Sequence, residues 1–179
     1  MSVRPLSNAD VPALSRLATP KVGQFFSDRI DTYDAMEAYV HAALADPSTQ
    51  AFTVESDGEV VGSTRLFRLD FPNRNGEIGH TFYAEHVWRT HVNTATKLLL
   101  LGYAFETLSL LRVSFRTDLR NVRSQAAIAR LGATNEGVNR NDRVVWDGYI
   151  RSSVTFSIIA EEWPAVKAGL SAKLAERDS

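Results

Sequence analysis

Apolar residues recur at helical spacing in the first part of the chain. Val3–Leu6 is typical of a short opening strand, and residues 10–18 and Thr32–Ala45 repeat apolar side chains every three or four positions. Because this spacing gathers them on one side of a helix, we predict two amphipathic helices. Their apolar positions are Val11, Leu14 and Leu17 in the first, and Met36, Tyr39, Val40 and Ala43 in the second.

The period then changes to that of β-strands. Ala51–Glu55, Val60–Leu69 and Gly76–Tyr83 are runs typical of strands. The Ser-Asp-Gly-Glu sequence at 56–59 predicts a hairpin turn, because Asp and Gly tolerate the positive φ that tight turns need. A proline and two asparagines in Asp70–Asn75 predict a loop before the third of these strands.

Helical spacing returns in the second half and alternates with strands. A long helix over Thr94–Leu110 is predicted to bury Ala95, Leu98, Leu99, Gly102, Phe105 and Leu108. The elements expected after it are a strand at Leu111–Thr117, a helix at Asn121–Leu131, a hairpin of Asn135–Val145 with Gly148–Ile159, and a last helix that begins at Trp163.

This order of elements predicts a mixed α/β fold. We expect a central, mostly antiparallel twisted sheet with helices on its flanks. The connection from Gly76–Tyr83 through the long helix to Leu111–Thr117 should be a right-handed crossover, so these two strands should be parallel. Since no repeat or linker-like stretch interrupts the pattern, one domain over residues 1–179 is expected.

Composition narrows the classes of function. The 179 residues are 44% hydrophobic and 23% charged with a net charge of -1, which argues against a general binder of nucleic acid or anionic membranes. The absence of cysteine excludes disulfides, thiolate metal sites and a cysteine nucleophile. Because no long apolar run or signal-peptide core is found, we expect a cytoplasmic protein without a membrane span.

The segment that leads into the long helix is the first candidate site. A helix N-terminus presents unpaired N–H groups and a partial positive charge, so it is a ready site for anions such as phosphates. Arg89 and His91 add donor side chains at the same end. Alternatively, Asn93 or Thr94 only caps the helix, and Arg89 is a solvated loop residue.

A second candidate site lies at residues 118–124, where the next strand leads into the next helix. If the two strands are parallel, both helices start beside their carboxyl ends, where α/β sheets bind ligands. Asn121 either caps the helix or hydrogen-bonds a ligand amide, and Ser124 is a donor on the first turn. Residues 112–151 hold eight arginines against four acids, a local net charge of +4, which either suits a small anionic ligand or forms a solvated basic face.

The Gly76–Tyr83 strand offers candidate acid–base groups. Strict alternation puts Glu77, Gly79 and Thr81 on one face, and Ile78, His80 and Phe82 on the other. Beside a cleft, desolvation would raise the pKa of Glu77 and suit a general base; on a solvated face it is an ordinary acid. His80 is the other candidate base, or a packing residue. The histidines are not clustered, so no metal site is expected, and no Walker A, dinucleotide or G-x-S-x-G motif occurs.

Several segments, in their order and spacing, match a known family: EIGHTFY, WRTHVNTATKLLLLGYAFETL, RVSFRTDLRNVRSQAAIARLGATNEGV, DGYIRSSVTFSI and EEWPAVKAGL. With them, the stretch Glu77–Val166 resembles the GNAT superfamily of acyl-CoA-dependent N-acetyltransferases, in particular its RimJ/RimL-like branch. The run DLRN-x-RS-x-x-AI-x-RLGA-x-x-EG is the most specific part. The resemblance implies the GNAT fold, in which two parallel strands splay apart within the sheet.

The resemblance implies how acetyl-CoA would be held. The family's pyrophosphate loop, Gln/Arg-x-x-Gly-x-Gly/Ala, matches Arg89-x-x-Val92-x-Thr94, where both glycines are replaced. Its backbone cradle can survive the replacements if φ stays negative there. Phe82 and Tyr83 would pair through their backbone with the pantetheine arm, and Asn121 and Ser124 would contact the pantetheine or acetyl region. The implied cofactor contacts in the loop are Arg89, Thr90, His91, Val92, Asn93 and Thr94.

Catalysis in this family is direct acyl transfer, in which a deprotonated amine attacks the thioester carbonyl and the thiolate leaves. The resemblance places Glu77 near the position of a general base, with Asn121 and Ser124 completing the implied catalytic set. Ile128 stands where many members have a Tyr general acid. Protonation of the thiolate would then fall to Ser124 or water, or the thiolate leaves unaided.

The implied function is an acetyl-CoA-dependent N-acetyltransferase that acts on a primary amine, either a protein N-terminal α-amine or a small molecule. A non-catalytic acyl-CoA-binding sensor on the same fold is the alternative, because the Tyr and both glycines are replaced. The amine pocket would form from residues 20–35 and 138–150. Family members often pair as homodimers, which implies a possible homodimer here. On charge and residue pattern we expect no metal, nucleic acid or membrane partner.

Overall fold

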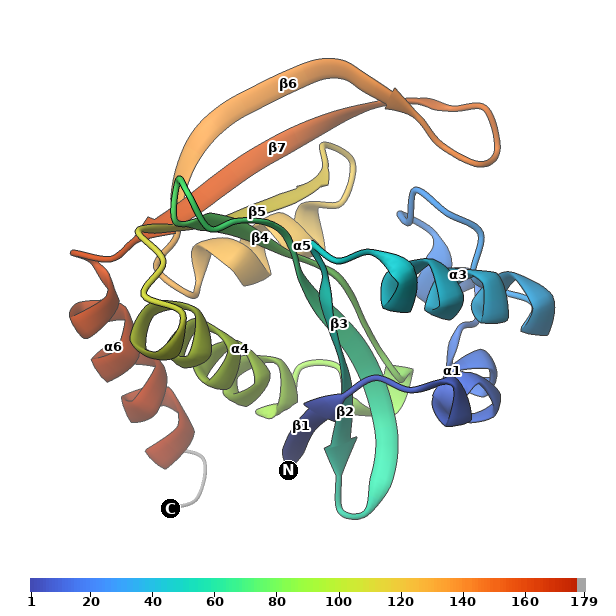
Figure 1. The fold of residues 1–179 in the computed structure, drawn as a ribbon, viewed down its shortest axis with the longest axis horizontal. Coiled ribbons are helices and arrows are strands. Elements are labelled where there is room, and N and C mark those ends of the chain that lie inside the picture. Colours follow the sequence, from blue (N-terminus) through green and yellow to red (C-terminus); the bar gives the residue numbers. More distant parts are fainter. Residues whose placement is uncertain (177–179) are drawn as a thin grey trace.

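The computed structural model describes residues 1–176 and contains one seven-stranded sheet (Figure 1). Its strands are β1 (Ser2–Pro5), β2 (Gln50–Ser56), β3 (Glu59–Asp70), β4 (Asn75–Tyr83), β5 (Arg112–Asp118), β6 (Thr134–Val144) and β7 (Ile150–Ile159). They lie in the order β1-β2-β3-β4-β5-β7-β6. Every neighbouring pair is antiparallel except β4 with β5, so the predicted mixed sheet with one parallel pair is confirmed.

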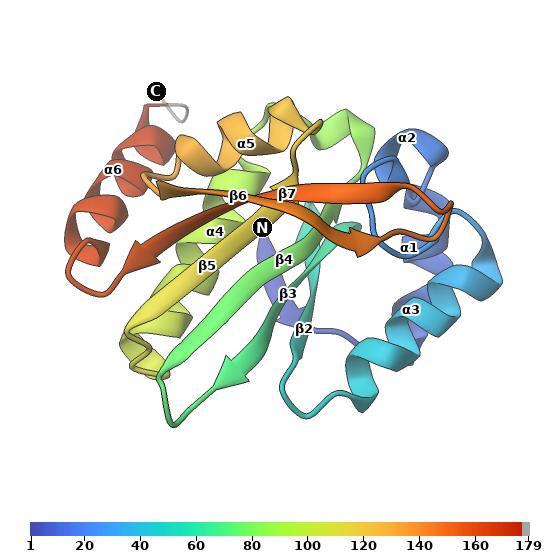
Figure 2. The ribbon, with the colours of Figure 1, turned by 90° about the horizontal axis from the view of Figure 1, so that it is seen from above.

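Helices bury both faces of this sheet. They are α1 (Val11–Leu17), α2 (Pro20–Gly23), α3 (Tyr33–Ala45), α4 (Val92–Gly102), α5 (Val122–Ala129) and α6 (Trp163–Ala175). One core, which includes Leu14, Val40 and Phe82, lies under α1–α3. The other, which includes Leu101, Phe115 and Leu170, lies under α4–α6. The two groups of helices stand at the right and the left of the view from above (Figure 2).

The long helix α4 differs from its prediction in both register and length. At Tyr103 it widens into a π turn that ends at Thr107, short of the predicted end. Leu99 was predicted to be buried and is 50% exposed. Four consecutive leucines at 98–101 fit more than one helical register, so their spacing does not fix the buried side. The residues that α4 buries are Val92, Thr96, Lys97, Leu100 and Leu101.

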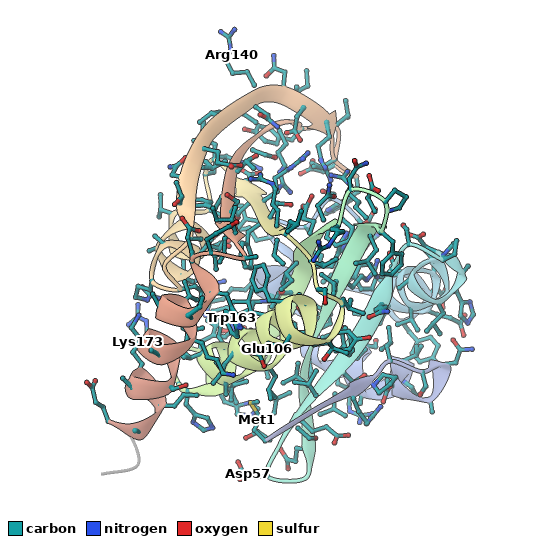
Figure 3. The ribbon with its side chains drawn as sticks, turned by 60° about the vertical axis from the view of Figure 1, so that its left-hand side comes forward. Met1, Asp57, Glu106, Arg140, Trp163 and Lys173 are labelled. Atoms are coloured by element: carbon teal, nitrogen blue, oxygen red, sulfur yellow. The ribbon has the colours of Figure 1, made fainter. Side chains whose placement is uncertain are left out.

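The last helix, α6, packs against the π turn that follows α4. Trp163, which opens α6 as predicted, stacks on Phe105 with ring centroids 5.6 Å apart. Its indole Nε1–H donates to Glu106 at 2.7 Å, and both residues are labelled in Figure 3. The indole thus buries its ring in the core and satisfies its polar atom at the rim.

Gly62 marks the closest approach between two strands. A Cβ atom there would lie 2.3 Å from the Phe82 carbonyl oxygen and 2.7 Å from the Tyr83 ring. We expect Gly62→Ala to lower the free energy of unfolding by about 1–3 kcal/mol, because β3 and β4 must move apart. Gly169→Ala is the matched control, since nothing lies within 4 Å and α6 should gain about 0.5–1 kcal/mol. Urea denaturation measures both, and equal stability of the two variants would contradict this account.

Candidate active site

The parallel strands β4 and β5 separate after three residue pairs. Residues 75–77 face residues 112–114, and no further pair follows. β5 stays on β7 as far as Asp118, and β4 stays on β3 as far as Tyr83. The edge of β4 over residues 78–83 therefore has no strand partner on the side toward β5. Such an edge can pair with an extended ligand that contains amide groups.

The helices α4 and α5 both begin near the open end of this splay. The Trp88 ring, in the loop before α4, is stacked by the Arg123 guanidinium of α5, whose carbon lies 3.9 Å from the ring centroid. The Lys21 ammonium approaches the same ring at 4.9 Å. The Lys21 ammonium is already paired with Glu85. Two helix N-termini and the Arg123 guanidinium thus lie together, an arrangement that favours anions.

The loop before α4 takes its unusual backbone at Arg89 instead of at the two positions where the family has glycine. Arg89 has φ 64°, whereas Val92 and Thr94 lie within the helix with negative φ. Both positions therefore have the negative φ that a backbone cradle without glycine requires. The Thr90 hydroxyl accepts from the Val92 N–H at 3.3 Å and donates to the Val87 carbonyl at 2.7 Å.

Neither Asn93 nor Thr94 caps α4, so the capping part of that alternative was wrong, whereas Arg89 is exposed as it expected. His91 occupies the N-cap position and makes no side-chain cap bond. Arg89 and His91 are exposed, and Asn93 and Thr94 are half-buried on the first turn. The Thr90 hydroxyl satisfies the first N–H of the helix, whereas Asn93 and Thr94 are not used for capping.

Asn121 caps α5. Its side-chain oxygen accepts from the Ser124 backbone N–H at 3.0 Å, which satisfies an otherwise unpaired donor of the first turn. The Ser124 side chain is half-buried beside it. Ile128 is 8% exposed and belongs to the core under α4–α6, so this helix offers no phenolic acid at that position.

A β-bulge in β4 breaks the predicted alternation of faces. His80 has φ 49°, and residues 80 and 81 together oppose Thr64 of β3. Thr81 therefore points to α4, where its hydroxyl accepts from Lys97 Nζ at 2.8 Å. His80 and Phe82 lie on the side of α1–α3 together with Glu77. The prediction that His80 and Ile78 share one face was wrong.

His80 is packed among aromatic rings. Its ring centroid is 4.9 Å from Phe67 and 5.7 Å from Tyr39. Burial and the nearby arginines lower the pKa of His80 to about 3, so the imidazole is neutral at ordinary pH. These contacts favour the packing role over that of a base.

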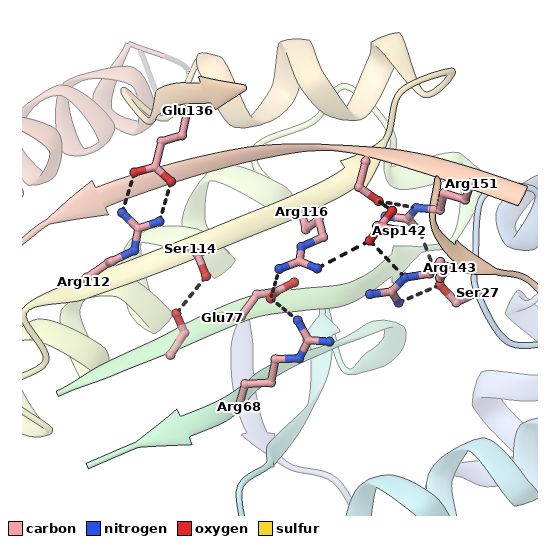
Figure 4. Close-up of polar contacts among 12 residues, drawn as sticks. Ser27, Arg68, Glu77, Arg112, Ser114, Arg116, Glu136, Asp142, Arg143 and Arg151 are labelled. Atoms are coloured by element: carbon pink, nitrogen blue, oxygen red, sulfur yellow. Dashed lines mark hydrogen bonds and ion pairs between the residues drawn. The ribbon is translucent and has the colours of Figure 1, made fainter. Parts of the chain in front are cut away.

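Glu77 is buried and paired with arginines. It is 6% exposed, and its Oε2 lies 3.0 Å from an Arg68 nitrogen and 3.9 Å from one of Arg116 (Figure 4). Arg116 continues to Asp142 at 3.5 Å. The guanidinium groups offset the cost of burying the carboxylate charge. Glu77 is thus neither an unpartnered carboxylate beside a cleft nor a solvated surface acid.

The sequence interpretation missed two sets of residues at this place. Arg65 and Arg68 of β3 face Glu77's side of the sheet, and only their position on a strand with alternating polarity could have indicated this. Lys97 is buried behind β4 and hydrogen-bonds Thr81 and Thr64. Lys97 lies outside the predicted apolar face of α4, so its burial follows from the register that the four leucines left open.

Within residues 1–176, no group of three or more His, Asp or Glu side chains is placed to hold a metal ion. No helix in the same range is long and apolar enough to cross a membrane.

The family is identified by comparison with known proteins. A model of the GNAT acetyltransferase domain matches residues 1–134, so the chain belongs to this family. A solved structure from T. thermophilus, described provisionally as an acetyltransferase, is 37% identical with a TM-score of 0.90, and the match covers 96% of this chain and 92% of that one. The implied family and fold are confirmed.

Further relatives carry more specific names. YdaF of Bacillus subtilis (strain 168), named provisionally as a ribosomal N-acetyltransferase, is 33% identical over 111 residues, which span 62% of this chain and 60% of that protein. Spermidine N(1)-acetyltransferase of Escherichia coli (strain K12) is 22% identical, covering 92% of this chain and 89% of that protein. RimJ of Mycobacterium smegmatis, solved with CoA-disulfide, shares the fold at 23% identity and a TM-score of 0.82, covering 96% of this chain and 88% of that one.

Lys97 gives a prediction about stability and pH. Burial lowers the pKa of Lys97 to about 7, whereas an unfolded lysine titrates near about 10.4. Between these values the unfolded chain binds more protons, so this group makes stability rise with pH by up to about 1.4 kcal/mol per pH unit. Lys97→Met should remove that slope, and Thr64 and Thr81 keep their mutual hydrogen bond of 2.7 Å. Urea denaturation at pH 7, 8 and 9 tests this, with the exposed Lys173→Met as control. Parallel curves for Lys97→Met and the parent would refute it.

Proposed function

We propose that this protein is an N-acetyltransferase that moves the acetyl group of acetyl-CoA to a primary amine. The observation that carries the proposal is the unpaired edge of β4 at residues 78–83, with the starts of α4 and α5 at its open end. The edge suits the amides of a pantetheine arm, and the helix N-termini with Arg123 suit a pyrophosphate. Membership in the GNAT family supports the same reading.

In the proposed reaction the chain mainly positions two substrates. The amine, once deprotonated, attacks the thioester carbonyl; a C–N bond forms, the C–S bond breaks, and CoA leaves as thiolate. Backbone N–H groups of the open β4 edge are suited to hold the carbonyl oxygen as charge develops on it. We assign Glu77 the removal of the amine proton through water, and Ser124 or water the protonation of the thiolate. Asn121 acts by fixing the first turn of α5.

A sensor that binds acyl-CoA without turnover is the second candidate. The buried Ile128 in place of a phenolic acid is the observation that favours it. Glu77→Gln separates the two: slower acetylation at unchanged acetyl-CoA affinity supports the enzyme. A parent protein that binds acetyl-CoA but releases no thiol with any amine supports the sensor.

Binding of acetyl-CoA is the first expected result. At about 100 times its dissociation constant, a ligand stabilises the folded state by about 2.7 kcal/mol, which is a shift of about 5–10 °C for a chain of this size. Thermal unfolding with 1 mM acetyl-CoA, taken as about that excess, should give this shift. Arg89→Glu should reduce it, and Arg140→Glu on the exposed surface of β6 should not. The absence of any shift in the parent would end both the enzyme and the sensor proposals.

Asn121 allows capping to be separated from ligand contact. Asn121→Ala should lower the free energy of unfolding by about 0.5–2 kcal/mol, because the Ser124 N–H loses its acceptor. Asn121→Asp keeps an acceptor and should restore stability. If Asn121 only caps, Asn121→Asp also restores the acetyl-CoA shift. If its amide donates to the ligand, Asn121→Asp restores stability alone.

A further inference from the structure

Five arginines gather on the side of the sheet that carries Glu77, and shared partners link four of them. Arg68 and Arg116 both pair with Glu77, and Arg116 and Arg143 both pair with Asp142. Arg143 and Arg151 both donate to the Ser27 hydroxyl, at 3.1 Å and 3.3 Å (Figure 4). Arg65, the fifth, stacks on the Tyr39 ring beside His80.

The positive charge of this arginine cluster is not balanced. Only Glu77 and Asp142 form ion pairs with it among residues 1–176, which leaves a net charge of +3. Asp118, at the end of β5, already forms an ion pair with Arg120 at 2.9 Å. Asp28, which acts on Tyr39, and Asp46, on which Arg65 acts, are both exposed, and counting them still leaves +1.

Two members of the cluster are buried without any ion pair. Arg65 is 7% exposed and Arg151 is 6% exposed. Arg65 donates only to the Tyr39 carbonyl at 2.8 Å, and Arg151 donates to the hydroxyls of Ser153 and Ser27. Burying a guanidinium without a carboxylate is unfavourable, and both burial and Arg143 lower the pKa of Arg151. A negative charge brought to this place would be stabilised.

Three donors of the cluster lack a hydrogen-bond acceptor in the described part of the chain, and three of its side chains are partly exposed. The Nε atoms of Arg65, Arg116 and Arg143 are buried and have no hydrogen-bond acceptor among the described residues. The side chains of Arg68, Arg116 and Arg143 are nevertheless 51%, 24% and 29% exposed. An oxyanion that approaches from solvent can therefore contact the exposed parts of these three side chains, although the Nε atoms themselves lie beyond its reach.

The cluster adjoins the place where acyl transfer is proposed. Glu77 is the last residue of β4 paired with β5, and Arg116 lies two residues beyond the last paired residue of β5. Ser27 and Arg143 belong to the two segments, 20–35 and 138–150, that were expected to form the amine pocket, and they contact each other. An anion bound at Arg116 and Arg143 would lie beside the splay.

We propose that the acceptor is an amine that also carries an oxyanion, a carboxylate or a phosphate, which docks on Arg116 and Arg143. The inference rests on the proposed function and names its substrate class. A polyamine such as spermidine fits poorly, because its cationic chain would meet a surface that already carries excess positive charge.

Matched pairs of amines test the charge preference. Thiol release from acetyl-CoA is measured with peptides that begin with Glu or Gln, with O-phosphoethanolamine or ethanolamine, and with spermidine. We expect kcat/KM to be about tenfold or more higher for the anionic member of at least one pair. A response of the peptide pair identifies a carboxylate and a response of the second pair a phosphate. Equal rates within both pairs, or spermidine as the best acceptor, would overturn the proposal.

Single substitutions test whether the arginine cluster causes the preference for anionic amines. Arg143→Gln should raise KM for the anionic amine and remove its advantage, whereas Arg140→Gln, exposed on the same strand, should leave it intact. Circular dichroism confirms that both variants are folded, and Arg116→Gln replaces Arg143→Gln if that variant is not. An advantage that survives both Arg143→Gln and Arg116→Gln contradicts the assignment.

A failure of the proposed acetyltransferase function can be distinguished from a failure of the anion site. If acetyl-CoA binds but no amine is acetylated, calorimetry with the Glu and Gln peptides on the acetyl-CoA-loaded protein decides about the anion site alone. Tighter binding of the Glu peptide that is lost in Arg143→Gln supports the site, and equal binding of the two peptides overturns it.

Discussion

The short parallel pairing of β4 with β5 is the constraint on which the rest of the site depends. Three residue pairs join the strands, and each strand is then held apart by its other neighbour, β3 for β4 and β7 for β5. Because both strands remain supported, the splay does not collapse, and an edge of β4 stays open. The helices α4 and α5 start where the strands end, so their positive ends flank the same opening.

The two sides of the sheet handle buried charge differently. On the side of α4, Lys97 is buried against threonine hydroxyls and has its pKa lowered. On the opposite side, arginines keep their charge and share Glu77 and Asp142. Lysine can give up its proton when burial is unfavourable, whereas arginine keeps it and requires anions. An anionic partner is therefore required only on the side of the sheet that carries the arginines.

Much of the fold could be predicted from the sequence because it depends on local period and on chain-crossing rules. The parallel pair followed from the crossover rule, and the starts of α5 and α6 followed from Asn121 and Pro164. The bulge at His80 could not be predicted, because it depends on pairing with β3 and leaves no mark in the alternation. The same holds for Arg65, whose neighbours Tyr39 and His80 are distant in the sequence. The site roles of Glu77, Arg89 and Ser124 remain predictions.

The narrow seam between β4 and β5 also divides the molecule mechanically. β1–β4 and β5–β7 meet in the sheet along three residue pairs. The core under α4, with Leu66 and Ile78 on one side and Val113 and Phe115 on the other, joins the two half-sheets together with the Glu77–Arg116 ion pair. A ligand that bridges the open edges would act as a further strut between them. Its binding would hold the two half-sheets in a fixed relative position and so stabilise the sheet as a whole.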